Sequence, residues 1–354
     1  MIRIAAVVRS VSKCRSQLTL LALALALLTV PQVGESRADE SQPLRAGIIG
    51  LDTSHVIAFT AALNDPEAEP PLAGIHVVAA FPGGSPDVEA SHTRIEGFTA
   101  KLRQEGIVIV DSIPALLERV DVVLLESVDG RPHLEQARGV LEARKPLFID
   151  KPVTASLADA LEIFELAERH GTPCFSSSSL RFTPGAIDAR DSDELGAILG
   201  CSVHSPCSLE PHHPDLFWYG IHGVEMLFTV MGTGCESVSR VQTEGSELVT
   251  GVWSGGRVGT FRGIREGKSE YGGLVYGSRA IRPLGPYPGY RPLLEAMAHF
   301  FRTGQPPVSA AETLEIVAFM EAADESKRQG GCPVSIESVF ERARAEVAAR
   351  RAGR

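Results

Sequence analysis

The stretch Arg45-Ala46-Gly47-Ile48-Ile49-Gly50-Leu51-Asp52-Thr53-Ser54-His55 carries an apolar strand into a glycine turn and then into a helix-like segment. Small residues in such a turn let backbone amides and a helix N-terminus approach a pyrophosphate. The G-x-G-x-x-G pattern counted from Gly50 is incomplete, because Asp52 and His55 stand at its second and third glycine positions. Spacing alone leaves two interpretations open: a dinucleotide-binding turn, or a turn in which Asp52, Thr53 or Ser54 caps the helix.

Outward from this turn, apolar strands alternate with helical patterns. The expected strands cover residues 45–51, 75–81, 107–110, 122–125 and 146–149. A further helix stops at Gly171, where a left-handed residue fits. Strands joined by crossover helices predict a parallel sheet covered on both faces, with a ligand crevice at the carboxyl ends of its strands.

The pattern changes after residue 177, where short strands follow one another without long helices between them. One helix is expected over residues 217–231, and closing helices begin at residue 291. The sequence therefore predicts an α/β domain with a doubly wound, Rossmann-like parallel sheet over residues 39–177. An α+β domain with a mainly antiparallel sheet is expected over residues 178–354.

The N-terminal stretch has the features of a secretory signal. It combines a basic start, an uncharged Leu/Ala-rich run over residues 18–30 and a small-x-small site at Ser36-Arg37-Ala38. An uncleaved anchor is the alternative, although the run is shorter than the roughly 20 residues that span a bilayer. We expect residues 1–38 to be removed, a secreted or periplasmic protein, and no membrane association after cleavage.

Composition narrows the class of ligand. The chain has a formal net charge of −10 and only 6% aromatic residues, which argues against nucleic acid and anionic membrane surfaces and favours a small ligand. The cysteines outside the leader are odd in number and contain no C-x-x-C, so they predict neither a disulfide framework nor a zinc ribbon. Cys201 and Cys207 either pair or remain buried thiols.

Two further segments lie where the expected strands end. NAD-binding folds commonly carry an acidic residue after the second strand, but here the sequence is Phe81-Pro82-Gly83-Gly84-Ser85. This segment either contacts a ribose or phosphate or forms a plain turn. After the strand at residues 146–149, Asp150-Lys151-Pro152 places an amine that can bind a substrate hydroxyl or relay a proton. The alternative is a solvated Asp-Lys pair before a helix.

Five segments together resemble the glucose-fructose oxidoreductase and inositol dehydrogenase family (Gfo/Idh/MocA) across essentially all of the sequence after the leader. They are residues 47–55, residues 121–146, Asp150-Lys151-Pro152 in place of the family's Glu-Lys-Pro, Arg181-Phe182 with Glu194-Leu195-Gly196, and Gly220-Ile221-His222. The resemblance implies hydride exchange between a nicotinamide cofactor, NAD or NADP, and a sugar or polyol carbinol.

The resemblance also implies roles for single residues. Lys151 would contact the reacting hydroxyl, and His222 would be the acid or base, which suits an imidazole with an unperturbed pKa of about 6.5. The family's Asp four residues before this histidine is Trp218 here. The residues expected at the cofactor are Gly47, Gly50, Asp52, Thr53, Ser54, His55, Gly83, Ser85, His133, Asp150 and Pro152.

The helix expected over residues 217–231 supplies candidates for substrate binding. Trp218, His222 and Glu225 fall on one helical face and would present a ring, an imidazole and a carboxylate. This combination suits a sugar, whose C–H face packs on aromatic rings while its hydroxyls need polar partners. Tyr219 and Arg181 are expected to bind the substrate as well. The alternative is a core tryptophan beside a His–Glu hydrogen bond.

A metal site is a weaker hypothesis. His204, His212, His213 and Asp215 lie close in sequence and offer ligand types for a divalent ion, but their spacing matches no metalloenzyme signature. We expect no metal and interpret residues 212–215 as a loop bordering the substrate cleft.

Three functions follow from these expectations. The leading one is a secreted oxidoreductase that holds NAD(P) tightly, because no free nicotinamide pool would recharge it outside the cytoplasm. The second is a lyase, hydratase or glycosidase that works by transient oxidation, and the third is a non-catalytic sugar-binding protein with a degraded cofactor site. A homo-oligomer is compatible with an open sheet face in the second domain.

Overall fold

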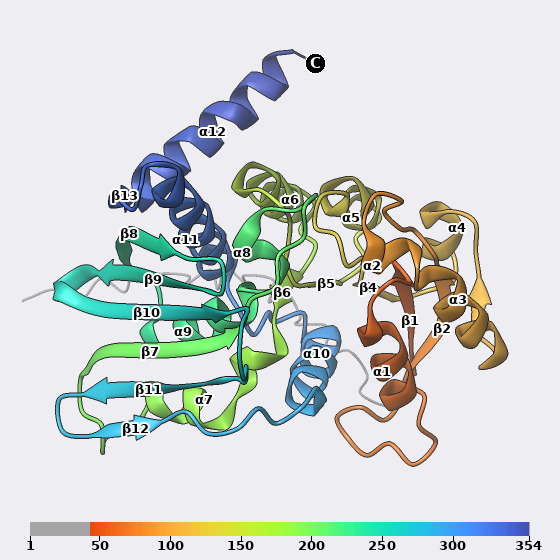
Figure 1. Cartoon of the computed structure of the whole chain (residues 1–354). Helices are drawn as coiled ribbons and strands as arrows, with labels where there is room; N and C mark the ends of the chain where they lie inside the picture. Colours follow the sequence, from red (N-terminus) through yellow and green to blue (C-terminus); the bar gives the residue numbers. More distant parts are fainter. Residues whose placement is uncertain (1–42, 354) are drawn as a thin grey trace, which may run out of the picture. The chain divides into compact units, whose positions relative to one another are not determined.

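The first sheet lies at the right of Figure 1 and has six parallel strands in the order β3-β2-β1-β4-β5-β6. The strands are β1 (Leu44–Ile49), β2 (Ile75–Phe81), β3 (Val108–Ile109), β4 (Val122–Leu125), β5 (Leu147–Asp150) and β6 (Cys174–Ser177). The strand order reverses at β1, which pairs with β2 on one side and β4 on the other. In such sheets the ligand crevice lies at this switch point, outside the carboxyl ends of the strands.

The computed structural model describes residues 43–353, which all belong to one structural unit. The predicted leader over residues 1–38 lies outside the described residues. Within residues 43–353, no helix combines the length and apolar character that a membrane crossing requires.

Helices connect the parallel strands as the crossover pattern predicts. They are α1 (Ser54–Leu63), α2 (Glu89–His92), α3 (Ile95–Gln104), α4 (Ile113–Leu117), α5 (His133–Glu142) and α6 (Leu157–His170). Thr53 caps α1 by accepting a hydrogen bond from the His55 backbone N–H, and Ser156 caps α6 in the same way through Asp159 N. The predicted stop at Gly171 is confirmed, since this residue ends α6 in the left-handed region with φ 63°.

The second sheet has seven strands in the order β12-β11-β7-β10-β9-β8-β13. They are β7 (Ile198–Pro206), β8 (Cys235–Gln242), β9 (Ser246–Trp253), β10 (Arg257–Ile264), β11 (Gly272–Gly277), β12 (Ile281–Pro283) and β13 (Val334–Ser335). Only the β7–β10 pair is parallel. The prediction of a Rossmann-like parallel sheet followed by a mainly antiparallel sheet is therefore confirmed.

The remaining helices pack against both sheets. They are η1 (Ser179–Phe182), α7 (Pro184–Arg190), α8 (Asp215–Trp218), α9 (Ile221–Met231), η2 (Ser254–Gly256), α10 (Arg291–Thr303), α11 (Ala310–Arg328) and α12 (Ile336–Ala352). The single helix expected over residues 217–231 is wrong at its start. The chain leaves the helical region at Tyr219, with φ −135° and ψ −28°, so α8 ends before α9 begins.

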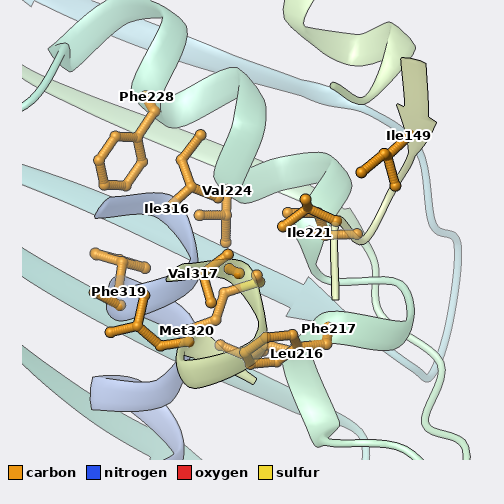
Figure 2. Packing of buried hydrophobic residues seen from close by; sticks show 14 of the residues in the cluster. Ile149, Leu216, Phe217, Ile221, Val224, Phe228, Ile316, Val317, Phe319 and Met320 are labelled. Carbon is orange, nitrogen blue, oxygen red and sulfur yellow. The ribbon is translucent and has the colours of Figure 1, made fainter. Parts of the chain in front are cut away.

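Two buried clusters hold these layers together. In Figure 2, apolar side chains of α8, α9 and α11 gather in one cluster, which also includes Ile149 at the end of β5. The second cluster joins Phe300 and five other side chains of α10 to Ile48 and Phe148 of the first sheet. Residues late in the chain thus pack against the N-terminal sheet, and the domain boundary at residue 177 stays a prediction.

Candidate active site

A cavity of about 530 Å³ opens at the carboxyl ends of the parallel strands. Its walls include the start of α1, the α2–α3 segment, the residue after β5, the α8–α9 junction and the segments that follow β10 and β12. Seven of the predicted site residues line it, namely Thr53, Ser54, His55, Lys151, Trp218, Tyr219 and His222. The other predicted site residues do not line the cavity.

The glycines of the turn let β1 pack closely against its neighbours. Gly50 has φ +88°, and a Cβ there would lie 2.4 Å from the backbone nitrogen of Ser127. A Cβ on Gly47 would lie 2.9 Å from a side-chain carbon of Val120. These two positions require glycine for backbone conformation and close approach, and they bring the N-terminus of α1 to the cavity wall.

Asp52 faces away from that wall. Its carboxylate is fully buried and accepts hydrogen bonds from Ser91 Oγ at 2.7 Å and from Val128 N at 2.9 Å. Burial raises the pKa of Asp52, although these two hydrogen bonds act in the opposite direction. Asp52 therefore ties α2 and the loop after β4 to the turn.

The segment after β2 forms a tied turn. Ser85 Oγ donates to Asp129 Oδ2 at 2.6 Å, and Ser85 N donates to Ser91 Oγ at 2.8 Å. Gly83 and Gly84 both have positive φ, as a turn of this kind requires. Residues 81–85 therefore form a turn in which the Ser85 hydroxyl donates to a protein acceptor, and their contact with a ribose or phosphate stays a prediction. Arg94, which the sequence analysis missed, lines the cavity beyond this turn.

His133 and Pro152 are buried beside the loops that follow β4 and β5. His133 Nε2 lies 2.9 Å from the carbonyl oxygen of Ser127, and its Nδ1 lies 3.1 Å from that of Val153. Burial lowers the pKa of His133. The imidazole therefore connects the loop after β4 to the loop after β5 at the carboxyl edge of the sheet.

Lys151 enters the cavity directly after β5. The preceding residue, Asp150, places Oδ2 at 2.7 Å from His55 Nδ1, and both side chains are buried. Burial alone would raise the pKa of Asp150, but the charges of His55 and Lys151 more than offset this and lower it. Glu126, which the sequence analysis missed, is buried next to this pair, and burial raises its pKa well above the usual range.

His222 meets Lys151 across the cavity from the start of α9. Its Nδ1 lies 2.7 Å from Ser178 Oγ, so the partner of this ring nitrogen is a hydroxyl. The ring of Tyr219 packs edge-on against the imidazole at 4.9 Å between centroids. Burial and the nearby charge of Lys151 lower the pKa of His222 well below its usual value, which keeps the imidazole neutral at pH 7.

The predicted face of Trp218, His222 and Glu225 is not formed. The break at Tyr219 separates Trp218 from α9, and Glu225, although three residues from His222 on α9, is buried where its Oε2 pairs with Arg181 Nε at 2.6 Å. Arg181 Nη1 also pairs with Glu312 Oε1 at 2.7 Å, and all three side chains are buried. A buried charge needs such partners, so Arg181 and Glu225 form an internal ion-pair network and do not line the cavity.

Tyrosines form a wall that the sequence analysis largely missed. Four of the five tyrosines of the chain line the cavity, namely Tyr219, Tyr271, Tyr287 and Tyr290. The hydroxyls of Tyr219 and Tyr271 lie 3.2 Å apart, and Ser179 Oγ lies 2.9 Å from the hydroxyl of Tyr287. Burial raises the pKa of Tyr290 to about 12, so its hydroxyl remains protonated. The cavity therefore offers ring faces and neutral hydroxyls together.

The histidines proposed as alternative metal ligands are dispersed. His213 Nε2 accepts from Gly130 N at 3.3 Å, and burial lowers the pKa of His213 to about 4. His212 pairs with Glu210, and Asp215 pairs with Arg240 and Lys327. Among residues 43–353 the one group whose ligand atoms lie close enough for a metal ion is His55, Glu126 and Asp150.

Cys201 and Cys207 are free, buried thiols, which decides between the two interpretations of this pair. Cys207 Sγ instead lies 2.8 Å from Glu247 Oε1.

The N-terminal part of the chain matches a known protein family. A model of an oxidoreductase family with an NAD-binding Rossmann fold matches residues 44–178. An inositol 2-dehydrogenase of Saccharopolyspora erythraea is 24% identical over 194 residues, which are 52% of each chain. The uncharacterized oxidoreductase YhhX of Escherichia coli is 28% identical over 111 residues, which are 28% of this chain and 32% of that protein. The chain thus matches about half or less of the length of these relatives.

Solved structures of similar fold cover more of the chain. The scyllo-inositol dehydrogenase of Lactobacillus casei, solved with NAD(H) and scyllo-inositol, matches 84% of this chain and 100% of its own with a TM-score of 0.69 and 13% identity. An NAD-binding protein from Listeria innocua matches 84% of this chain and 98% of its own with a TM-score of 0.63 and 18% identity. At these identities the likeness concerns the fold, including both sheets.

Proposed function

Since this chain belongs to the Gfo/Idh/MocA family of NAD-binding oxidoreductases, we propose that it exchanges a hydride between a tightly held NAD(P) and a carbinol of a sugar or cyclitol. One observation carries the proposal: Lys151 after β5 and His222 at the start of α9 line the same cavity, beside the N-terminus of α1. Such a reaction requires residues that transfer a proton and a site that binds the pyrophosphate of the cofactor.

The residues at the turn fit a dinucleotide. Helix N-termini bind pyrophosphate through free backbone amides and the helix dipole, and Thr53 and Ser54 line the cavity at this end of α1. The Asp52 carboxylate, which would repel a phosphate, is held by Ser91 and Val128 away from the cavity lining. Arg94 adds a positive charge to the same cavity. We therefore assign the pyrophosphate to Thr53, Ser54 and the first amides of α1.

The bound nicotinamide would supply the hydride acceptor or donor, and the protein's own residues would handle the proton. The Lys151 amine would donate a hydrogen bond to the reacting oxygen. In the tautomer whose Nδ1–H donates to Ser178, His222 keeps a lone pair on Nε2 and accepts the carbinol proton. Its neutral state at pH 7 suits the base in the oxidation direction.

The wall of the cavity suits a carbohydrate or cyclitol. Rings of Trp218 and the four tyrosines supply surfaces for C–H faces, and the tyrosine hydroxyls supply hydrogen bonds for substrate hydroxyls. The scyllo-inositol dehydrogenase of similar fold was solved with a cyclitol, which is consistent with this substrate class.

Location and assembly are parts of the same proposal. The basic, apolar and small-residue pattern of residues 1–38 supports export to the periplasm or beyond, where a retained cofactor would be an advantage. Exposed apolar side chains on neighbouring strands of the second sheet, namely Val241, Leu248, Val252, Val258 and Leu274, support a homo-oligomer that buries this face.

The test begins with the nucleotide. Purified protein is denatured and filtered, and the filtrate is expected to contain about one adenine dinucleotide per chain. A panel of cyclitols and aldoses is then added to the intact protein, and a change in nicotinamide absorbance without added cofactor is expected. Turnover with a retained nucleotide but no net absorbance change would instead support a lyase, hydratase or glycosidase that oxidises transiently.

Variants locate the chemistry. Lys151→Met is expected to keep its nucleotide and to lose about 100-fold or more in turnover, the range typical of a proton-transfer group. Thr93→Val, at another lining position, is the control and is expected to retain activity. A nucleotide-free protein that also fails to bind NAD or NADP would support the non-catalytic sugar-binding alternative and overturn the proposal.

A further inference from the structure

A second polar cluster lies under the cavity floor, where β4 and β5 end. His55 of α1, Glu126 after β4 and Asp150 of β5 bring one nitrogen and two carboxylate oxygens within 4.8 Å of one another. His55 Nδ1 lies 2.7 Å from Asp150 Oδ2 and 4.0 Å from Glu126 Oε2. All three side chains are buried.

The carboxylates of this cluster are under-partnered. Neither oxygen of Glu126 has a hydrogen-bond partner in residues 43–353, and Asp150 Oδ1 has none there either. Glu126 has no exposed surface, so bulk solvent does not reach these oxygens. Buried carboxyl oxygens without hydrogen-bond partners are costly, and a bound cation would supply the partner that these three atoms lack. Lys151 faces the cavity nearby, and no hydrogen bond from its amine to either carboxylate is present within the described chain.

We propose that His55, Glu126 and Asp150 together bind one divalent metal ion. A nitrogen and two carboxylate oxygens that all lie within 4.8 Å match the span of a single ion whose ligand distances are about 2.0–2.2 Å, after small side-chain adjustments. Imidazole with carboxylates suits Zn²⁺ or Mn²⁺ better than Ca²⁺, which prefers six or more oxygen ligands. The ion would take the place of the proton between His55 and Asp150 and of the proton that the buried Glu126 holds.

The surroundings of His55 meet two further requirements of a metal site. Its ring is stacked on Phe59 at 5.1 Å and packs edge-on against Tyr290 at 4.9 Å, which fixes its orientation. His55 also lines the cavity, and this gives the ion a path from solvent and leaves a coordination position open toward a bound hydroxyl. The proposed proton transfer uses Lys151 and His222 and does not require this ion.

Binding is measured on protein treated with a chelator and then titrated with MnCl₂ or ZnCl₂ by calorimetry. One ion per chain is expected. Glu126→Gln keeps the shape of the side chain and removes the charge, and it is expected to weaken binding by about tenfold or more. The matched control is Glu89→Gln, which makes the same change at an exposed position of the same cavity and is expected to leave affinity unchanged.

Two readouts keep the result independent of turnover. Electron spin echo spectra of bound Mn²⁺ are expected to show coupling to an imidazole ¹⁴N that disappears in His55→Gln. Saturating Mn²⁺ is expected to raise the melting temperature of the wild-type protein and not that of Glu126→Gln. Absence of binding, or equal weakening by Glu126→Gln and Glu89→Gln, would overturn the site.

Discussion

The Nδ1 atom of His222 lies 2.7 Å from the hydroxyl oxygen of Ser178, which itself accepts a hydrogen bond from the backbone of Leu180 at 3.1 Å. The imidazole is therefore oriented by a neutral hydroxyl that is fixed at the start of η1. A hydroxyl holds the ring in place without stabilising its protonated form as a carboxylate would. This relationship makes His222 a neutral proton acceptor with a defined orientation.

Ser178→Ala is expected to reduce turnover by about tenfold, because the ring loses its orientation and its preferred tautomer. Binding of NADH, which Ser178 does not contact in our proposal, should be unchanged. Steady-state kinetics across pH 5 to 9 checks this, and the loss should appear in kcat more than in KM. Equal kcat values for the variant and the wild type would show that Ser178 does not position His222.

Arg181→Met is expected to lower the free energy of unfolding by about 3–5 kcal/mol, because it leaves Glu225 and Glu312 buried without their common partner. Urea denaturation followed by circular dichroism measures the change. Arg138→Met, which removes a surface cation paired only with exposed Glu135, is the control and should cost less than about 1 kcal/mol. A variant of normal stability with a raised KM would instead restore Arg181 to substrate binding.

Asp324 gives the folded protein a specific pH dependence. Burial raises its pKa to about 7, although Arg240 Nη1 lies 2.5 Å away and acts in the opposite direction. Between about pH 4 and 7 the folded protein keeps a proton that the unfolded chain has lost, so this residue makes stability fall as pH rises, by up to about 1.4 kcal/mol per pH unit. Asp324→Asn should flatten that fall, as measured by urea denaturation at pH 5, 6 and 7. An unchanged slope would mean that Asp324 is ionised throughout.

The open face of the second sheet predicts the effect of a charge on assembly. Val252 and Val258 are cross-strand neighbours on β9 and β10, and each exposes more than a third of its surface. Val258→Glu is expected to convert an oligomer to monomers in light scattering coupled to size exclusion. Ile187→Glu, at an exposed apolar position on α7, is the control and should not change the mass. A wild-type monomer at micromolar concentration would contradict the oligomer.

The sequence predicted those parts of the fold that depend on local pattern. The structure has β2 at Ile75–Phe81 and β4 at Val122–Leu125, as expected, because both are short apolar runs bounded by turns or charges. The return of α10 to the first sheet was not predictable in this way, since its apolar face fits any covered surface.

Local sequence pattern also predicted part of the site. Lys151 and His222 belong to motifs with fixed positions on strand and helix, and the structure brings both to one cavity. Glu225 was misplaced because α9 is buried along its whole length and the partner of this carboxylate, Arg181, comes from a distant segment that helical spacing does not reveal. The tyrosine wall and the partner of His222 depend on contacts between distant segments, which spacing along the chain does not encode.

The most direct test of the account is equilibrium binding of reduced nicotinamide cofactor to protein stripped of bound nucleotide. The chain has two tryptophans, of which Trp218 lines the cavity and Trp253 is fully buried. Excitation of tryptophan during titration with NADH or NADPH is expected to give saturable nicotinamide emission at one ligand per chain, and most of this energy transfer should vanish in Trp218→Phe. Failure of both cofactors to saturate the wild-type protein would contradict the claim that this cavity holds a dinucleotide.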